Sequence, residues 1–227
     1  YNGTPRHTVT ILDGIRRKIG AQRVKFIEGC GLVQPHRRGN QVLTTQQLVE
    51  EVGDVKMVIF VGGISPQLEG EQLEVEAKGF KGGDRVTIEL PQVQREMIAA
   101  LHAAGKQVIM VNCSGSAIGL VPEVTHTDAI LQAWYPGERG GEAVADVLFG
   151  DYNPAGKLPV TFYRDDSQLP DYQDYNMRDR TYRYFKGKPL FPFGHGLSYT
   201  SFKIGKAKVK NGKLTVSVKN TGKRDGE

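Results

Sequence analysis

Two glutamates stand one residue apart in the segment GISPQLEGEQ, which runs from Gly63 to Gln72. They are Glu69 and Glu71, and they follow an apolar run at 58–61 that is typical of a buried strand. A carboxyl group that donates a proton near neutral pH needs partial burial or a neighbouring negative charge. The residue types therefore leave two interpretations open: a solvated acidic loop, or a loop that carries a general acid.

The elements that must position these glutamates alternate between helix and strand along the chain. Helical spacing or capping signals predict helices that begin near Ile11, Thr44, Pro91 and Gly140. Apolar runs predict strands over 23–30, 55–63, 107–115, 129–137 and, less regularly, 157–163. This alternation is typical of an α/β fold with a doubly wound, mostly parallel sheet flanked by helices.

Ligand sites in such sheets form outside the carboxyl ends of the strands. The segments GISPQLEGEQ, NCSGS and WYPGERGGE each follow an expected strand, so we expect them to meet at one edge. The long polar segment from Ile64 to Glu89 brings Asp84 and Arg85 to the same region. Loops of this length in compact domains are usually functional or disordered. The position of the glutamates therefore favours a role in chemistry.

Composition and motifs exclude several other classes of function. The chain has 227 residues, 39% of them hydrophobic and 24% charged, which is typical of a soluble globular protein. No apolar run approaches the roughly 20 residues of a membrane span, and the start of the chain lacks the pattern of a secretory leader. The net charge of +5 arises largely from tail lysines that alternate with apolar residues. We interpret them as the solvated face of a strand, and we expect no nucleic-acid partner.

No cofactor or metal is predicted. The glycines after the first expected strand fail the dinucleotide fingerprint because Gln34 takes the place of the third glycine. The five histidines are scattered without the spacing of metal ligands. Cys30 and Cys113 make neither a disulfide framework nor a zinc site, so we expect buried free thiols.

The organisation changes after Phe162, where aromatics, prolines and charges replace the helical periodicity. We expect an ordered excursion across the body of the domain. The sequence AKVKNGKLTVSVKNTG near the end alternates between polar and apolar residues, and Asn211-Gly212 is a strong turn signal. It predicts two strands joined in a hairpin.

Three longer stretches resemble the C-terminal half of family-3 glycoside hydrolases. They are VGGISPQLEGE with GFKGGDRVTIELPQVQREMI, then ILQAWYPGERGGEAVADVLFGDYNPAGKLPVTFY, and finally RTYRYF with PLFPFGHGLSYTSF. The first stretch looks most like the β-xylosidase branch. The resemblance covers nearly the whole chain. It implies an α/β sandwich domain over 1–163, an aromatic-rich trailing segment over 164–202, and the first strands of a fibronectin type III-like domain over 203–227.

The resemblance also implies a reaction. Such enzymes remove terminal β-linked sugars with retention of configuration, which requires two carboxylates about 5–5.5 Å apart. An aspartate nucleophile would lie in an N-terminal barrel domain that this sequence lacks, and a glutamate of the sandwich domain would be the acid/base. Glu71 is the first choice for it and Glu69 the alternative, because the stretch 72–83 looks like an insertion that shifts the alignment. The chain alone is therefore expected to be inactive.

Further expectations concern the substrate and the compartment. The substrate would be an oligosaccharide or another β-glycoside, most simply one with a terminal xylose. Trp134 would form an aromatic wall for a sugar ring or pack in the core, and Arg85 would contact substrate. A β-glucosidase and a non-catalytic sugar-binding or scaffold module are the alternatives. The resemblance implies a periplasmic or secreted protein.

Overall fold

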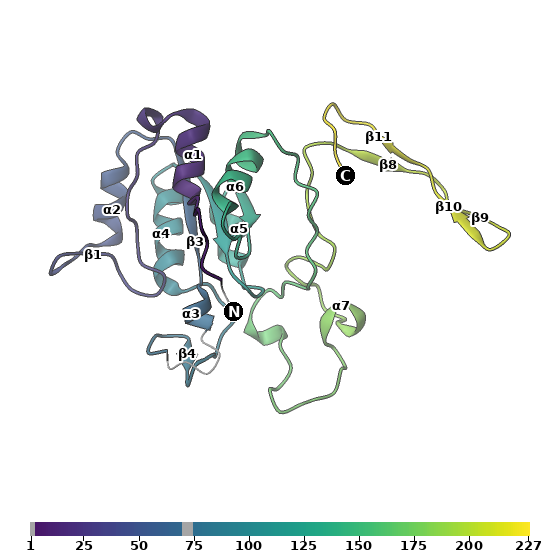
Figure 1. Ribbon diagram of the computed structural model, residues 1–227. Helices are drawn as coiled ribbons and strands as arrows, with labels where there is room; N and C mark the ends of the chain where they lie inside the picture. The colour runs from purple at the N-terminus through teal and green to yellow at the C-terminus, as the bar shows by residue number, and fades with distance from the viewer. Residues whose placement is uncertain (1–2, 70–74) are drawn as a thin grey trace. The chain divides into compact units, whose positions relative to one another are not determined.

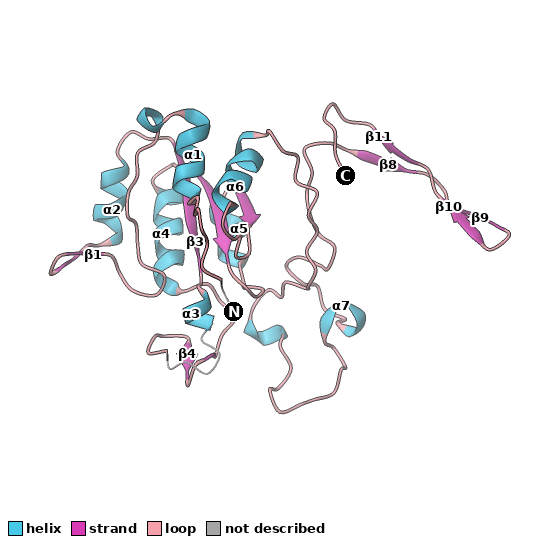
Figure 2. Ribbon diagram, in the orientation of Figure 1, coloured by secondary structure: helices cyan, strands magenta, loops and turns pink. Residues whose placement is uncertain are grey.

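The computed structural model describes residues 3–69 and 75–227. These residues form two compact units, which Figures 1 and 2 show in ribbon form. Unit 1 consists of the described parts of 1–24, 138–159 and 194–227. Unit 2 consists of the described parts of 25–137 and 160–193.

A parallel sheet of three strands forms the centre of unit 2 (Figure 2). Its order is β3 (Met57–Gly63), β6 (Gln107–Cys113) and β7 (Ala129–Gln132). The crossover helices between these strands are α4 (Gln92–Ala103) and α5 (Val121–His126), and α4 packs against β3, β6 and α5. Helix α2 (Thr45–Val52) packs against α4 in turn. The α/β class and the parallel sheet flanked by helices are confirmed.

The core of unit 2 lies around β6, the middle strand. Val108, Met110 and Val111 have no exposed surface, and neither does Ile98 on α4. Strand β3 is an edge strand instead, and Met57 and Val61 are 51% and 47% exposed. A continuous apolar run predicts a strand that is buried on both faces. This prediction is correct for β6 and wrong for β3.

Two of the five expected strands are wrong. Segment 23–30 holds only the end of the 3-10 helix η1 (Ala21–Arg23), and residues 24–30 pair with no strand in the described chain. Phe26 in this segment is 58% exposed. An apolar pattern shows that the side chains of a segment are compatible with a β-strand. The strand forms only where a neighbouring strand is available for backbone hydrogen bonds.

Segment 157–163 is reduced to a single antiparallel bridge between Phe162 and Phe191. Both backbone groups of Phe162 bond to residues 190–191, at distances from 2.9 to 3.2 Å. Pro189 and Pro192 flank this partner and cannot donate to a ladder. No continuous strand pairing forms, although Leu158 also exchanges backbone hydrogen bonds with Gly194 and His195.

The four predicted helices are confirmed, and so is the capping box predicted at Thr44. Helix α1 (Ile11–Ile19) begins after Thr10, which forms a capping box with Asp13, and ends at Gly20. Helix α2 begins with the expected capping box of Thr44 and Gln47. Pro91 precedes α4, and α6 (Gly140–Phe149) ends at Gly150 in the left-handed conformation.

Several short elements complete the described chain. In unit 2 they are β1 (Arg37–Arg38), β2 (Gln41–Val42), α3 (Pro66–Glu69), β4 (Phe80–Lys81), β5 (Asp84–Arg85), η2 (Asp166–Gln168) and α7 (Thr181–Tyr184). Cys30 and Cys113 are free thiols, as expected, but they are half-buried rather than fully buried. No helix among the described residues is long and apolar enough to cross a membrane.

Unit 1 pairs α1 with α6 through two glycines (Figure 1). A Cβ added at Gly14 would lie 2.0 Å from the Gly141 carbonyl oxygen, and one at Gly141 would lie 2.0 Å from the Thr10 carbonyl oxygen. The helices can approach this closely only because neither position carries a side chain. Glu142 in the first turn of α6 bonds to Arg17 and Arg139 and complements the helix dipole.

The end of unit 1 is a long hairpin of strands β8 (Phe202–Ile204), β9 (Lys208–Lys210), β10 (Lys213–Thr215) and β11 (Val218–Asn220). Strand β8 pairs with β11 and β9 with β10, around a turn at Asn211 and Gly212. Both turn residues have positive φ, at 50° and 71°, as a type I′ turn requires. The predicted hairpin is therefore confirmed.

A one-residue bulge gives this hairpin two unlike faces. Ile204 pairs with Val218 and Val209 pairs with Leu214, yet residues 205–208 stand opposite only 215–217. The extra residue brings Ile204 and Val209 to the same face, where strict alternation would separate them. These apolar side chains are between 63% and 74% exposed.

A buried ion pair yields a stability prediction. Glu123 on α5 is 1% exposed and accepts a hydrogen bond from Arg95 Nε at 3.0 Å. Burial raises the pKa of the Glu123 carboxyl, and the Arg95 charge opposes that shift. We expect Arg95→Ala to lower the free energy of unfolding by about 3–5 kcal/mol, because it leaves a buried charge uncompensated. Urea unfolding measures this value.

The exposed Arg178→Ala is the matched control for that measurement and should stay within about 0.5 kcal/mol of the parent. The double variant Arg95→Met/Glu123→Leu should recover part of the loss, because the buried Glu123 charge is then gone and only the less buried Glu89 has lost its Arg95 partner. A cost for Arg95→Ala no larger than the cost of the control would contradict the role assigned to this pair.

Candidate functional site

Glu69 lies at the carboxyl edge of the sheet, on the last residue of α3. Gly63 ends β3 with a φ of 118°, and a Cβ there would lie 2.0 Å from the Cys113 carbonyl oxygen. The chain then turns, and Ile64 N donates to that same carbonyl at 2.8 Å. Ser65 accepts a hydrogen bond from Leu68 N and starts the short helix. A glycine at the strand end therefore lets Glu69 reach the ends of the neighbouring strands.

The Glu69 side chain binds to residues that follow the other two strands. Ser116, after β6, donates its hydroxyl to Oε1 at 2.6 Å. Tyr135, after β7, donates its hydroxyl to Oε2 at 2.8 Å. Both carboxylate oxygens thus accept hydrogen bonds from hydroxyl groups. One side chain connects all three strand ends.

Arg85 approaches the same hydroxyl from the β4–β5 hairpin. Its Nη1 donates to Ser116 Oγ at 3.0 Å. Its Nη2 is buried and has no hydrogen-bond partner among the residues that the structure describes. Burial lowers the pKa of the guanidinium, and the Glu69 charge opposes the shift. The group still carries its positive charge at neutral pH.

Gly115 makes room for the Glu69 carboxylate. A Cβ built on this glycine would lie 2.4 Å from Glu69 Oε2 and 2.7 Å from the Tyr135 ring. Real Cβ atoms do not approach other atoms so closely. The backbone after β6 therefore needs a glycine beside Ser116 for this set of contacts to form.

A second polar network lies just beneath, at the ends of β6 and β7. Asn112 is fully buried, and its Nδ2 donates to Gln132 Oε1 at 2.6 Å and to Ser114 Oγ at 3.2 Å. Gln132 Nε2 donates to Ser114 at 3.1 Å, and Ser114 donates to the Ser116 carbonyl at 2.9 Å. Apart from Asn112 Oδ1, which has no partner, the network is satisfied and fixes the backbone that carries Ser116.

The backbone of Trp134 is strained. Its φ of 55° is unusual for a bulky residue, and such strain gathers at functional sites. The ring packs edge-on against the buried Phe162, with centroids 6.1 Å apart and planes at 71°. Trp134 is nevertheless only half-buried. Trp134 packs on the core and also keeps exposed surface. Both interpretations from the sequence, core packing and an aromatic wall for a sugar ring, therefore remain open.

The structure therefore brings some of the predicted site residues together, but not all of them. Glu69 and Arg85 come together on one hydroxyl, whereas Trp134 is the sequence neighbour of Tyr135, a Glu69 partner. Glu71 lies outside the described residues. Sequence reasoning missed Ser116 as the link between Glu69 and Arg85. The available signal was the polar run NCSGS directly after an apolar strand.

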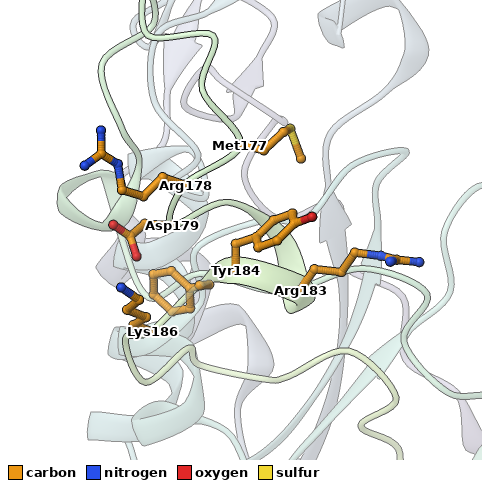
Figure 3. A pocket seen from close by; sticks show the side chains of 7 residues that line it. Met177, Arg178, Asp179, Arg183, Tyr184 and Lys186 are labelled. Atoms are coloured by element: carbon orange, nitrogen blue, oxygen red, sulfur yellow. The ribbon is translucent and has the colours of Figure 1, made fainter.

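An open depression lies elsewhere in unit 2, around α7 (Figure 3). Residues 177–179 and 183–186 line it, and three of their side chains are cationic. Of the predicted site residues that the structure describes, none lines this depression. In the described chain, no group of three or more potential ligands is placed to hold a metal ion.

Comparison with known proteins assigns the chain to a family. The model of the glycosyl hydrolase family 3 C-terminal domain matches residues 1–199. The chain belongs to the family-3 glycosyl hydrolases. The strand ends that carry Glu69, Ser116 and Tyr135 lie within the matched region, as does Arg85.

Its relatives include enzymes named for two sugars. The chain is 62% identical over 187 residues to a xylan 1,4-beta-xylosidase of Xylanibacter ruminicola, covering 80% of this chain and 22% of that protein. It is 34% identical to a periplasmic beta-glucosidase of Salmonella typhimurium, covering 99% and 33%. The family-3 chain thus spans only 22–33% of the length of such relatives.

A solved structure supports the fold over the whole chain. A family-3 exo-beta-xylosidase, determined with a xylobiose aziridine activity-based probe, superimposes with a TM-score of 0.79. The identity is 25%, and the match covers 99% of this chain and 32% of that one.

The tight packing at Gly115 yields a second prediction. We expect Gly115→Ala to lower the free energy of unfolding by about 1–3 kcal/mol, because the added methyl group forces Glu69 and Tyr135 apart. Urea unfolding, followed by the fluorescence of Trp134, the single tryptophan, measures it. Gly29→Ala is the control, since nothing lies within 4 Å of a Cβ there.

Combining Gly115→Ala with Glu69→Ala identifies the cause of that loss. The methyl group should cost less once the carboxylate is absent, so the two changes should not be additive. Strict additivity would mean that the penalty arises from the backbone rather than from the Glu69 contact.

Proposed function

We propose that this chain is the acid/base-bearing part of a retaining, exo-acting β-glycosidase, most simply a β-xylosidase that removes terminal β-D-xylose. The observation that carries the proposal is the 62% identity to a xylan 1,4-beta-xylosidase over 80% of the chain. The superposition on an exo-beta-xylosidase supports it independently. The aspartate nucleophile would come from an N-terminal barrel domain of the same enzyme, which would therefore be the main partner of this chain.

Glu71 is the proposed acid/base and Glu69 the alternative. A general acid must hold a proton for the leaving oxygen, then accept one from water. The geometry around Glu69 argues against this role for it, because both oxygens already accept hydrogen bonds from hydroxyls. These contacts hold the Glu69 side chain in place, which favours Glu71 for the proton transfer.

Arg85 and Trp134 are proposed to help hold the sugar. The buried Nη2 of Arg85 can donate a hydrogen bond and finds no acceptor within the described part of the chain. A sugar hydroxyl or a shifted loop carbonyl would satisfy it. The strained backbone and half-buried ring of Trp134 support a role at the rim, since sugars commonly lie against aromatic faces.

The remaining parts of the chain fit the same proposal. Residues 1–163 would be the sandwich domain and 164–202 its trailing segment. The hairpin, from 203 on, would begin a fibronectin type III-like domain, whose other strands would cover the exposed apolar face. A periplasmic or secreted location follows from the resemblance and is supported by the name of the Salmonella relative.

Two other functions have specific tests. A β-glucosidase is favoured by the 34% identity to the Salmonella protein over nearly the whole chain. Comparing aryl β-xylosides with aryl β-glucosides on the full-length enzyme decides between the two sugars. A non-catalytic sugar-binding or scaffold module would instead bind xylo-oligosaccharides tightly by itself, which calorimetry detects.

The acid/base assignment makes a kinetic prediction for the full-length enzyme. We expect Glu71→Gln to lower kcat/KM on phenyl β-xyloside by about 10²–10⁴-fold, because the leaving oxygen loses its proton donor. Dinitrophenyl β-xyloside should suffer far less in the first step, since its leaving group needs no protonation. Azide should then accelerate turnover by attacking the glycosyl-enzyme in place of activated water.

Glu76→Gln is the matched control, a nearby acidic residue that should leave both substrates unaffected. Full activity of Glu71→Gln, with the leaving-group dependence transferred to Glu69→Gln, would exchange the two roles. Robust turnover by the 227-residue chain alone would refute the division of the catalytic pair between two domains.

A further inference from the structure

The terminal hairpin of unit 1 has a lysine face on the side opposite its apolar face. Residues directly opposite one another in a strand pair point to the same side, and neighbouring pairs alternate between the two sides. The apolar pairs are Ile204 with Val218 and Val209 with Leu214, and the pairs next to them carry lysines. The one-residue bulge keeps these lysines on one side along the whole hairpin. The lysine face consists of Lys203, Lys208, Lys210, Lys213 and Lys219.

The charge of the lysine face is not neutralised within the described chain. From 201 to 224 the sequence contains seven lysines, one arginine and no acidic residue. All five lysines of the face are exposed, and none forms an ion pair with a described residue. Lys203 stands directly opposite Lys219, and Lys210 directly opposite Lys213. Like charges in this position destabilise a strand pair, and an anionic partner on the face would offset that cost.

The lysines follow the length of the hairpin. Strands β8 and β11 form its first part and continue into β9 and β10, which end at the turn (Figure 1). Residues two positions apart on one strand, such as Lys208 and Lys210, are roughly 6.6 Å apart. This spacing is far wider than the one charge per about 1.7 Å of duplex DNA. A linear polymer whose charges are separated by uncharged units therefore fits the lysine face better than a nucleic acid does.

The residue types of the lysine face favour carboxylate groups on a carbohydrate. Its cations are all lysine, whereas arginine is the residue of choice for bidentate recognition of phosphate and nucleic acid. Thr215, opposite Lys208, adds a hydroxyl that can exchange hydrogen bonds with sugar hydroxyls. On this side of the described strand pairs there is no aromatic residue. The face therefore lacks a platform for stacked bases and an anchor for a lipid surface.

We propose that the lysine face binds an anionic polysaccharide, a linear chain in which sugar rings carry carboxylate groups. This inference rests on the proposed function, because a glycosidase works among polysaccharides. The rest of a fibronectin type III-like domain would pack on the apolar face, and that packing leaves the lysine face in water. Binding of the polymer raises the concentration of its chain ends near the enzyme.

The test is the binding of the full-length enzyme to polygalacturonate, a linear polymer with one carboxylate on each sugar. Calorimetry in about 50 mM NaCl should detect binding, and about 200 mM NaCl should weaken it by about 10-fold or more, because salt screens each charge contact. Fully methyl-esterified polygalacturonate keeps the sugar backbone without the charges. It should not bind to the lysine face.

A charge-swap variant separates binding from folding. Lys203→Glu/Lys213→Glu turns both like-charge pairs into pairs of opposite charge, so thermal unfolding should occur at the parent temperature or above it. The affinity for polygalacturonate should nevertheless fall by about 10-fold or more, because the face then carries three lysines and two glutamates. Lys56→Glu/Lys188→Glu makes the same change of charge at two exposed lysines of unit 2. This matched control should bind polygalacturonate as the parent does.

Three results would contradict this inference. The parent enzyme could fail to bind polygalacturonate, or the charge-swap variant could bind it as tightly as the parent; either result would overturn the lysine face as the binding surface. Tighter binding of duplex DNA or of phosphatidylglycerol vesicles, at equal concentrations of anionic groups, would overturn the choice of partner.

The proposed function is tested separately, on the uncharged substrate phenyl β-xyloside. The charge-swap variant should keep the parent kcat and KM on it, because this substrate has no charge for the lysine face to attract. An enzyme that binds polygalacturonate through the lysine face but does not hydrolyse aryl β-glycosides would refute the proposed function and leave the binding surface in place.

Discussion

The parallel pairing of β3, β6 and β7 is the constraint on which the candidate site depends. The register sets Gly63 beside Cys113 and Asn112 beside Gln132, so the three strands finish at one edge. Segments that are about 20 or more residues apart in sequence therefore start their loops within reach of one another. A single carboxylate can then bind the loops after the other two strands, as Glu69 does. Without that register, its partners would lie on separate faces or at separate ends.

Close backbone approach is the second requirement, and it explains how most of the described polar groups at this edge find partners, Asn112 Oδ1 and Arg85 Nη2 excepted. The glycines at 63 and 115 let chain segments come nearer than a Cβ would permit. Buried amides and hydroxyls then find partners at 2.6–3.2 Å, which offsets the cost of removing them from water. Glu69 and Arg85 are not joined by a direct ion pair among the described contacts; Ser116 stands between them. The arrangement fixes both charges in position while each keeps hydrogen bonds of its own.

Local sequence patterns were sufficient to predict the helices. They were not sufficient to predict every strand, because a strand also needs a partner from a distant part of the chain. Capping boxes at Thr10 and Thr44 and the Asn211-Gly212 turn depend on residues within four positions, so the pattern contains the whole cause. The run at 23–30 has strand-like composition but no ladder partner, and no local pattern reveals that. For the site, the strand ends predicted that the loops carrying Glu69, Ser116 and Tyr135 meet at one edge, as they do, but not that Glu69 and Arg85 share a partner. The linking role of Ser116 depends on rotamers and distances across 31 and 47 positions, which only the folded chain supplies.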